Sequence, residues 1–312
     1  MKKVFVILGQ TATGKSNLAV KIALRLCSGP SAQKLGGEII SADSRQVYKS
    51  LNIGTGKITA KEMHGIPHHL LDVVNPKKKF SVTEYQKLAE EKIKEIINKN
   101  KIPIICGGTG FYIDAITKGI IFLEVPPNWK LRKKLALVDD RLLMLKLQKL
   151  DPERAKNIDA KNKVRLIRAI EIAKALGKVP PLKQYSDNNV TNSAIAENVS
   201  PYRFIKIGLY LPEDKLKKKI KIRLEKRMKM GMLNEAKKLH EHGLSWKRME
   251  ELGLEYRFMA LHLQNKISKK EMLDKLNSEI YKYAKRQMTW FKRDKSIKWY
   301  DASKPIKIKD IF

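Results

Sequence analysis

Two kinds of hydrophobic pattern divide this chain into strands and helices. Short apolar runs rich in β-branched residues predict strands near residues 4–8, 39–40, 102–106 and 202–211. Segments with apolar residues three and four positions apart predict helices at 17–26, 82–98, 212–242, 246–264 and 268–293. Because strands and helices alternate over most of the chain, we expect an α/β fold with a parallel sheet flanked by helices.

The pattern changes at residue 126. From there the chain is helical in pattern and highly charged, without a candidate strand, until the polar run SDNNVTNSAIAENVSP. We therefore predict that residues 126–200 form an all-helical insertion domain. Residues 1–125 and 201–312 would make up the core domain.

The run VFVILGQTATGKS fits the phosphate-binding pattern G-x-x-x-x-G-K-[ST], directly after an apolar strand. The glycines of such a loop allow a backbone path that turns successive N–H groups inward, at the positive end of the following helix. The lysine adds a point charge, and the serine hydroxyl can bind Mg²⁺. This P-loop consists of Gly9, Gln10, Thr11, Ala12, Thr13, Gly14, Lys15 and Ser16. It indicates a P-loop NTPase-like core that binds a polyphosphate, and it leaves open whether that ligand is a nucleotide such as ATP.

Two polar side chains follow other predicted strands. Asp43 comes just after the strand at 39–40, and Thr109 lies in the run GGTG after the strand at 102–106. Because ligands of an open α/β sheet bind at the carboxyl ends of the strands, both should lie beside the P-loop. Asp43 could be a general base, an outer partner of Mg²⁺ or the N-cap of the next helix, and spacing alone leaves these roles open.

Charge is the strongest compositional signal. The chain has 65 Lys and Arg residues against 32 Asp and Glu residues, a net charge of +33. Such a surface would concentrate RNA, but a genome biased toward Lys, Ile and Asn would give the same excess. In the last predicted helix Lys285 and Arg286 are interleaved with aromatic residues, a pattern that suits an RNA loop, although Trp290 could equally belong to the core.

The cysteines, histidines and apolar runs of the chain argue against a metal-binding, a membrane-spanning and a secreted protein. Cys27 and Cys106 have no metal-ligand spacing, and the adjacent His68 and His69 would point to opposite faces of a strand. No apolar run is long enough for a membrane helix, and none resembles a signal peptide. We therefore expect a cytoplasmic protein whose cysteines and histidines are structural.

Taken in order, these motifs resemble those of the tRNA dimethylallyltransferases, also called tRNA isopentenyltransferases. The resemblance covers nearly the whole chain, and the joint order of the motifs is far more specific than any one of them. Two features depart from the family pattern: Gln10 replaces a common Pro, and the loop at 28–37 is longer. The motifs are GQTATGKS at Gly9, EIISADSRQVY at Glu38, NIGTGK at Asn52, HHLLDV at His68, GGTGFY at Gly107, VRLIRAIEI at Val164, LGLEYR at Leu252 and AKRQMTWFKR at Ala284.

The resemblance implies transfer of a dimethylallyl group from dimethylallyl diphosphate to the exocyclic amine of the adenosine 3′ of the anticodon in tRNA, with release of diphosphate. Asp43 would accept the amine proton, and Thr109 would help to fix the flipped-out adenine. The P-loop, Mg²⁺ at Ser16 and Arg223 would neutralise the diphosphate. The insertion would grip the anticodon arm, and the enzyme would act as a monomer. The tRNA contacts that the resemblance implies are Asp43, Ser44, Arg45, Gln46, Thr109, Arg132, Asn162, Lys163, Val164, Arg165, Leu166, Lys285, Arg286 and Gln287.

Three other functions compete with this one. A free-nucleotide isopentenyltransferase would use the same P-loop on AMP or ATP, although the helical insertion and the basic last helix favour a large anionic acceptor. A small-molecule or nucleoside kinase would hold ATP in the P-loop, with Arg165 and Arg168 as its lid. A non-catalytic RNA-binding protein would bind tRNA without turnover, and the intact P-loop, Asp43 and Thr109 argue against it.

Overall fold

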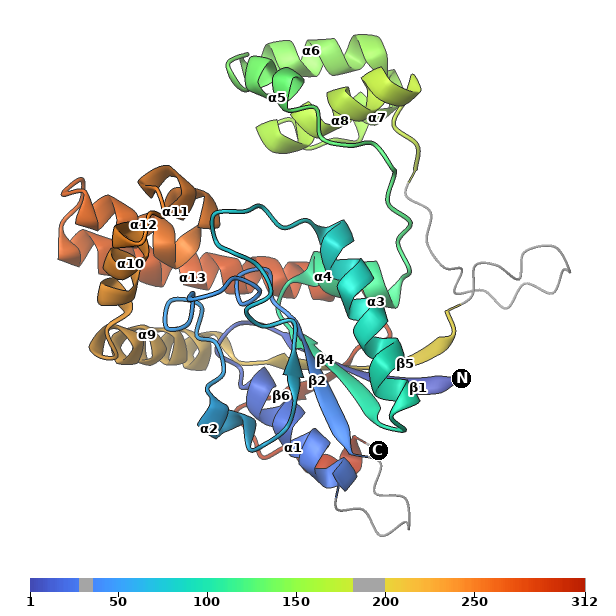
Figure 1. Ribbon diagram of the computed structural model, residues 1–312, viewed down its shortest axis with the longest axis vertical. Helices are drawn as coiled ribbons and strands as arrows, with labels where there is room; N and C mark the ends of the chain where they lie inside the picture. Colours follow the sequence, from blue (N-terminus) through green and yellow to red (C-terminus); the bar gives the residue numbers. More distant parts are fainter. Residues whose placement is uncertain (28–35, 182–199, 312) are drawn as a thin grey trace, which may run out of the picture. The chain divides into compact units, whose positions relative to one another are not determined.

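The computed structural model describes residues 1–27, 36–181 and 200–311, in two compact units (Figure 1). The larger unit combines residues 1–119 with 186–312, and the smaller one covers 120–185. Most of the loop at 28–37 and the end of the predicted insertion, at 182–199, lie outside the described residues. Within the described ranges no helix is long and apolar enough to cross a membrane.

The larger unit is built on a six-stranded sheet in the order β3-β2-β4-β1-β5-β6, in which all neighbouring strands are parallel. The predicted α/β fold with a parallel sheet is thereby confirmed. The edge strand β6 was not predicted from the sequence, because its four residues are half-buried or exposed and form no apolar run. The strands are β1 (Lys2–Gly9), β2 (Gly37–Ala42), β3 (His68–His69), β4 (Ile102–Gly107), β5 (Tyr202–Tyr210) and β6 (Lys298–Asp301).

Helices cover both faces of this sheet. Phe5 and Ile7 of β1 pack in one apolar cluster with α1 (Lys15–Cys27). Val4 and Val6 point to the opposite face, where they pack with α3 (Val82–Asn98), α4 (Gly110–Thr117) and the end of α13 (Lys269–Phe291). Strands buried on both faces need apolar side chains at every position, which explains the continuous apolar runs in the sequence.

Glycines divide two of the helices that the sequence predicts near the C-terminus. Gly231, with φ of 91°, separates α9 (Glu213–Lys229) from α10 (Met232–Glu241). Gly253, with φ of 80°, separates α11 (Trp246–Leu252) from α12 (Leu254–Leu263). A positive φ ends a right-handed helix, so the predictions of single helices at 212–242 and 246–264 were wrong. Together with α13, these four helices bury one apolar cluster against Val47 and Leu51.

The smaller unit is helical. Its helices are α5 (Trp129–Ala136), α6 (Asp140–Leu150), α7 (Pro152–Lys156) and α8 (Lys163–Leu176). Leu143, Leu147 and Leu166 form part of its core and are fully buried. The expectation that Leu166 contacts tRNA is therefore corrected, because its side chain faces the core of this unit.

Candidate functional site

The P-loop connects β1 to α1, and its two glycines fix its path. Gly9 has φ of 132°, and a Cβ atom there would lie 2.1 Å from the carbonyl oxygen of Leu209 in β5. Gly14 has φ of 89°, which L side chains rarely adopt. A side chain at Gly9 would displace the backbone of β5, whereas one at Gly14 has open space but would be strained by the positive φ. The loop therefore runs close against the sheet and leads into the N-terminus of α1, where backbone N–H groups favour an anion.

Hydrogen bonds from its own side chains close the P-loop. Thr13 Oγ1 donates to the Gln10 carbonyl oxygen over 2.8 Å, and Lys15 Nζ donates to the same oxygen over 2.6 Å. The buried side chain of Gln10 accepts a hydrogen bond of 3.3 Å from the backbone N–H of Leu211, just beyond β5. Gln10 is the residue that departs from the family pattern, and here it anchors the P-loop to the sheet.

Burial sets the protonation of two groups at this loop. It lowers the pKa of Lys15 to about 8, although the negative charge of Asp43 partly opposes the shift. Burial also raises the pKa of the Cys106 thiol to about 11. Near neutral pH the lysine is therefore mostly charged, and the thiol is protonated and is not a nucleophile.

Asp43 and Thr109 lie at neighbouring strand ends, as predicted from the sequence. Asp43 Oδ1 accepts hydrogen bonds from the backbone N–H groups of Arg45 (2.8 Å) and Gln46 (3.3 Å). Thr109 Oγ1 accepts a hydrogen bond of 3.0 Å from the backbone N–H of Ser44. Asp43 thus caps the turn that follows β2, and within the described residues its second oxygen, Oδ2, accepts no hydrogen bond. The predicted role as N-cap of the next helix was wrong, because a turn and not a helix follows Asp43, and the next helix begins only at Ala60. One oxygen of the Asp43 carboxylate is still available for chemistry.

Gln287 of α13 connects the P-loop to the turn after β4. Its side chain is 6% exposed, accepts a hydrogen bond of 2.8 Å from the backbone N–H of Thr11, and donates one of 2.8 Å to the Gly108 carbonyl oxygen. A Cβ atom at Gly108 would lie 2.3 Å from Gln287 Nε2. This corrects the expected tRNA contact of Gln287, since its amide is occupied between two loops of the core.

The basic end of α13 is partly exposed. Lys285 and Arg286 are exposed, as an RNA contact requires. Trp290 is half-buried, its Nε1 donates to Asp114 Oδ2 over 3.1 Å, and its ring packs edge-on against Phe111 of α4. Of the two roles considered for Trp290, packing in the core is therefore the one that its contacts support.

Arginines of the smaller unit are held by a buried carboxylate. Glu171 accepts hydrogen bonds from Arg132 Nε (2.9 Å) and Nη2 (2.6 Å), and it also pairs with Arg168. Burial would raise the pKa of Glu171, but the hydrogen bonds from these arginines lower it overall. Arg168 also donates to the Val125 carbonyl oxygen. Arg132 and Arg168 therefore stabilise the fold of this unit through Glu171.

The N-terminal turn of α8 carries the exposed candidates of this unit. Val164 is 77% exposed, and Arg165 is also exposed. Asn162 caps the helix by accepting from the backbone N–H of Arg165, and Lys163 Nζ lies 3.6 Å from Asp140 Oδ1. Unlike Leu166, these residues lie where a large ligand can reach them.

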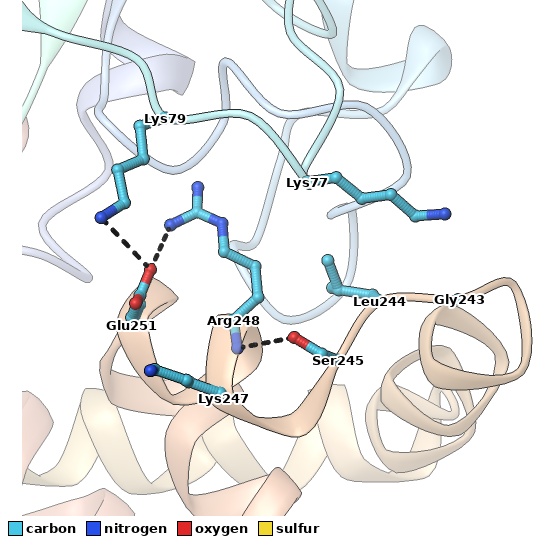
Figure 2. Close-up of a pocket in the computed structure, with 8 residues that line it drawn as sticks. All are labelled: Lys77, Lys79, Gly243, Leu244, Ser245, Lys247, Arg248 and Glu251. Carbon is cyan, nitrogen blue, oxygen red and sulfur yellow. Dashed lines mark hydrogen bonds and ion pairs between the residues drawn. The ribbon is translucent and has the colours of Figure 1, made fainter. Parts of the chain in front are cut away.

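Apart from the P-loop region, a basic pocket of about 370 Å³ lies between the loop after β3 and the turn from α10 to α11 (Figure 2). Arg248 holds its walls together by donating to the carbonyl oxygens of Pro76 (2.8 Å) and Lys78 (2.6 Å). Figure 2 also shows Glu251 between Arg248 and Lys79, at 3.2 and 3.9 Å. The side chains that line the pocket include four positive groups and one negative group. The lining residues are Lys77, Lys79, Gly243, Leu244, Ser245, Lys247, Arg248 and Glu251.

Comparison with known proteins connects this site to a family. The model of the IPP transferase family matches residues 46–294. A tRNA dimethylallyltransferase 1 from Geotalea daltonii is 38% identical, over 96% of this chain and 90% of the relative. A tRNA dimethylallyltransferase 2 from Treponema denticola is 41% identical, over 92% and 91%.

A solved structure gives the same result for the fold. The full-length tRNA isopentenylpyrophosphate transferase from Bacillus halodurans matches with a TM-score of 0.70 and 33% identity, over 100% of this chain and 93% of that one. The relatives and the solved structure agree over nearly the whole length of the protein, including the P-loop, and the family model agrees over residues 46–294. This chain belongs to the IPP transferase family, the family of the tRNA dimethylallyltransferases.

Proposed function

We propose that this protein transfers the dimethylallyl group of dimethylallyl diphosphate to the exocyclic amine of the adenosine 3′ of the anticodon in tRNA. The observation that carries the proposal is the sheet order β2-β4-β1, which brings Asp43, Thr109 and the P-loop to three adjacent strand ends. One edge of the sheet thus combines a diphosphate cradle with a carboxylate and a hydroxyl. Among the polyphosphates that a P-loop can bind, family membership supports the prenyl donor.

The diphosphate of the prenyl donor would lie in the P-loop. Its oxygens accept from the loop N–H groups and from Lys15, while Arg223, whose Nη1 lies 3.3 Å from Thr11 Oγ1, approaches from α9. As the allylic carbon–oxygen bond breaks, the electron pair leaves with the diphosphate. Fixed positive charges stabilise the growing negative charge without needing to reorganise.

The residues present fit a magnesium ion. Ser16 is exposed at the first turn of α1, and Asp43 follows β2, which is separated from β1 and its P-loop only by β4. Among the described residues no group of three or more His, Cys, Asp or Glu side chains could hold a metal. Mg²⁺ usually binds few protein ligands and shares substrate phosphates, so Ser16 with the diphosphate suits it. When bound, Mg²⁺ supplies positive charge to the leaving diphosphate.

Asp43 would act as the general base. The adenine amine nitrogen forms the new bond to the allylic carbon, and its proton passes to Asp43 Oδ2, while Oδ1 keeps its hydrogen bonds to the turn. Thr109, fixed by Ser44, would hydrogen-bond the adenine once it leaves the base stack. The hydrogen bonds that fix these side chains pre-orient them for the reaction.

The tRNA partner would meet several exposed basic groups. Lys285 and Arg286 on α13 and Arg165 on α8 are exposed, and the lysines of the basic pocket in Figure 2 suit backbone phosphates. In the smaller unit Arg132 would support tRNA binding indirectly, by holding Glu171 and so the fold of the unit. Contacts with tRNA would come from Asn162, Lys163 and Val164. The monomeric state and the cytoplasmic location stay predictions from the sequence.

The test is transfer of label from radiolabelled dimethylallyl diphosphate, with Mg²⁺, to an anticodon stem-loop containing three successive adenosines or to free AMP. We expect label on the stem-loop and none on AMP. Label on AMP alone would favour the free-nucleotide enzyme. No label on either acceptor, together with ATP-dependent phosphorylation of nucleosides, would favour the kinase.

A further inference from the structure

A carboxylate of α10 holds a loop that is far away in sequence. Glu235 Oε2 accepts hydrogen bonds from the backbone N–H groups of Asn52 (3.0 Å) and Ile53 (2.7 Å), and Oε1 accepts one from Gly54 (2.9 Å). Oε1 also accepts from the Tyr256 hydroxyl over 2.7 Å. Four hydrogen bonds thus converge on one side chain, and three of them come from successive residues of the motif NIGTGK, which we call the 52–57 loop.

A second set of contacts fixes the same loop from α9 and α12. Arg227 Nη1 donates to the Gly54 carbonyl oxygen over 2.7 Å, and Nη2 pairs with Glu255 at 2.9 Å. The Tyr256 ring lies so close that a Cβ atom at Gly54 would be 2.6 Å from its hydroxyl oxygen. Glu255 and Tyr256 belong to LGLEYR, so two motifs with no role in the proposed site meet at this loop.

The 52–57 loop in turn contacts the arginine that faces the P-loop. Arg223 Nη2 donates to the Gly56 carbonyl oxygen over 3.3 Å, and Nη1 donates to Thr11 Oγ1 over 3.3 Å. Gly56 has φ of 60°, and a Cβ atom there would lie 2.1 Å from Arg223 Nη2. The guanidinium is therefore confined between the two loops.

Arg223 forms no ion pair with a carboxylate of the described residues. Burial lowers its pKa and the neighbouring guanidinium of Arg227 lowers it further, while the more distant carboxylates of Glu255, Asp43 and Glu62 oppose the shift only in part. Arg227 has Glu255 as its partner, whereas no carboxylate of the described residues lies within ion-pair distance of Arg223. A desolvated, unpaired cation is costly unless an anion binds beside it, and a diphosphate in the P-loop would be that anion.

We propose that Glu235 is a positioning residue for the diphosphate of the prenyl donor, acting through the 52–57 loop on Arg223. This proposal rests on the proposed function for the identity of the donor. Replacing the Glu235 carboxylate by a carboxamide would keep one acceptor oxygen and turn the other into a donor, so the hydrogen bonds to that second oxygen would be lost and a donor would face a backbone N–H group. The loop would then no longer confine Arg223 beside Thr11, and the site would lose a preorganised cation without losing any residue that touches RNA.

The experiment compares the whole wild-type protein with Glu235→Gln, which keeps the side-chain shape. Inorganic diphosphate with Mg²⁺ is the probe for direct binding, and label transfer to the stem-loop gives KM and kcat. We expect diphosphate Kd and the KM for dimethylallyl diphosphate to rise about tenfold, since a carboxamide cannot replace a carboxylate that accepts four hydrogen bonds. The stem-loop Kd should stay within about twofold. A purely structural role would instead lower the melting temperature and the active fraction and leave both constants for diphosphate unchanged.

Two further variants complete the comparison. Glu241→Gln removes an exposed carboxylate of the same helix, 3.9 Å from Lys237, and should change nothing. Tyr256→Phe removes one of the four hydrogen bonds and should weaken diphosphate binding about threefold, which provides the test if Glu235→Gln does not fold. If Glu235→Gln and Tyr256→Phe fold but bind diphosphate as tightly as the wild type does, the proposal is overturned, even if the wild type prenylates the stem-loop. A wild type that binds diphosphate but transfers no label would instead reject the proposed function.

Discussion

The lowered pKa of Lys15 predicts a pH dependence of the reaction. Burial brings this pKa to about 8, so about nine tenths of the free enzyme carries a charged Lys15 at pH 7 and about one tenth at pH 9. If the diphosphate binds to the charged form, kcat/KM for dimethylallyl diphosphate should fall about tenfold between these values. The profile is measured at constant ionic strength, with the stem-loop held well below its Kd, so that kcat/KM for dimethylallyl diphosphate reports the pKa values of the free enzyme.

Lys15→Arg provides the matched control for this profile. A guanidinium stays charged throughout this pH range, so the variant should be slower overall but flat from pH 7 to 9. A flat wild-type profile would refute the lowered pKa. The same tenfold fall in the variant would assign the titration to a different group.

The same lysine makes a second prediction, on stability. Its pKa is lower in the folded protein than the usual 10.5, so the folded state binds this proton less tightly than the unfolded state. The free energy of unfolding is lowered by this difference in proton binding. The lowering is fully present below about pH 8 and disappears as the pH rises to about 10.5. It amounts to at most about 3.4 kcal/mol, from 1.36 kcal/mol for each of about 2.5 pKa units. Lys15→Met should therefore raise the melting temperature at pH 7 and change it less near pH 10, as expected where a site is held for function rather than stability.

Three further variants test the base, the basic pocket and the core of the smaller unit. Asp43→Asn keeps an acceptor for the turn and removes the base, so turnover should fall by roughly two to four powers of ten while the stem-loop Kd stays unchanged. The double variant Lys77→Ala with Lys247→Ala should weaken stem-loop binding and reduce the slope of log Kd against log salt by about two. Leu166→Ala should destabilise the smaller unit by about 2–5 kcal/mol, measured by urea unfolding, since it leaves a cavity in a closed core.

Each of these has a result that would contradict it. Full turnover of Asp43→Asn would remove Asp43 from the chemistry and leave it only its capping role. An unchanged salt slope in the lysine variant would mean that the basic pocket does not contact RNA, and Lys21→Ala, at an exposed site on α1, serves as its comparison. Val164→Ala is the control for Leu166→Ala and should cost less than about 0.5 kcal/mol, because Val164 is 77% exposed.

The sequence alone predicted the features that depend on short stretches of chain. The P-loop could be located because its two glycines and its lysine act within eight residues, after a strand with an unmistakable apolar run. Asp43 and Thr109 could be placed beside it without coordinates, because parallel strands share one carboxyl edge. These local rules, with the order of the motifs, were sufficient for the fold and the family.

Tertiary structure decided the features that depend on contacts between distant segments. The family resemblance locates a motif but not the direction of each of its side chains, so Gln287 and Leu166 were expected at an RNA surface and are buried instead. Gly231 and Gly253 sit within continuous apolar periodicity, and only their positive φ values reveal that the helices end there. Glu235 gives no signal in a chain with 32 acidic residues, because its importance comes from backbone N–H groups about 180 residues away. The spacing of apolar residues in the sequence indicates which side of a helix or strand is buried. The hydrogen-bond partner of a buried polar group comes from a distant segment and is determined only by the tertiary structure.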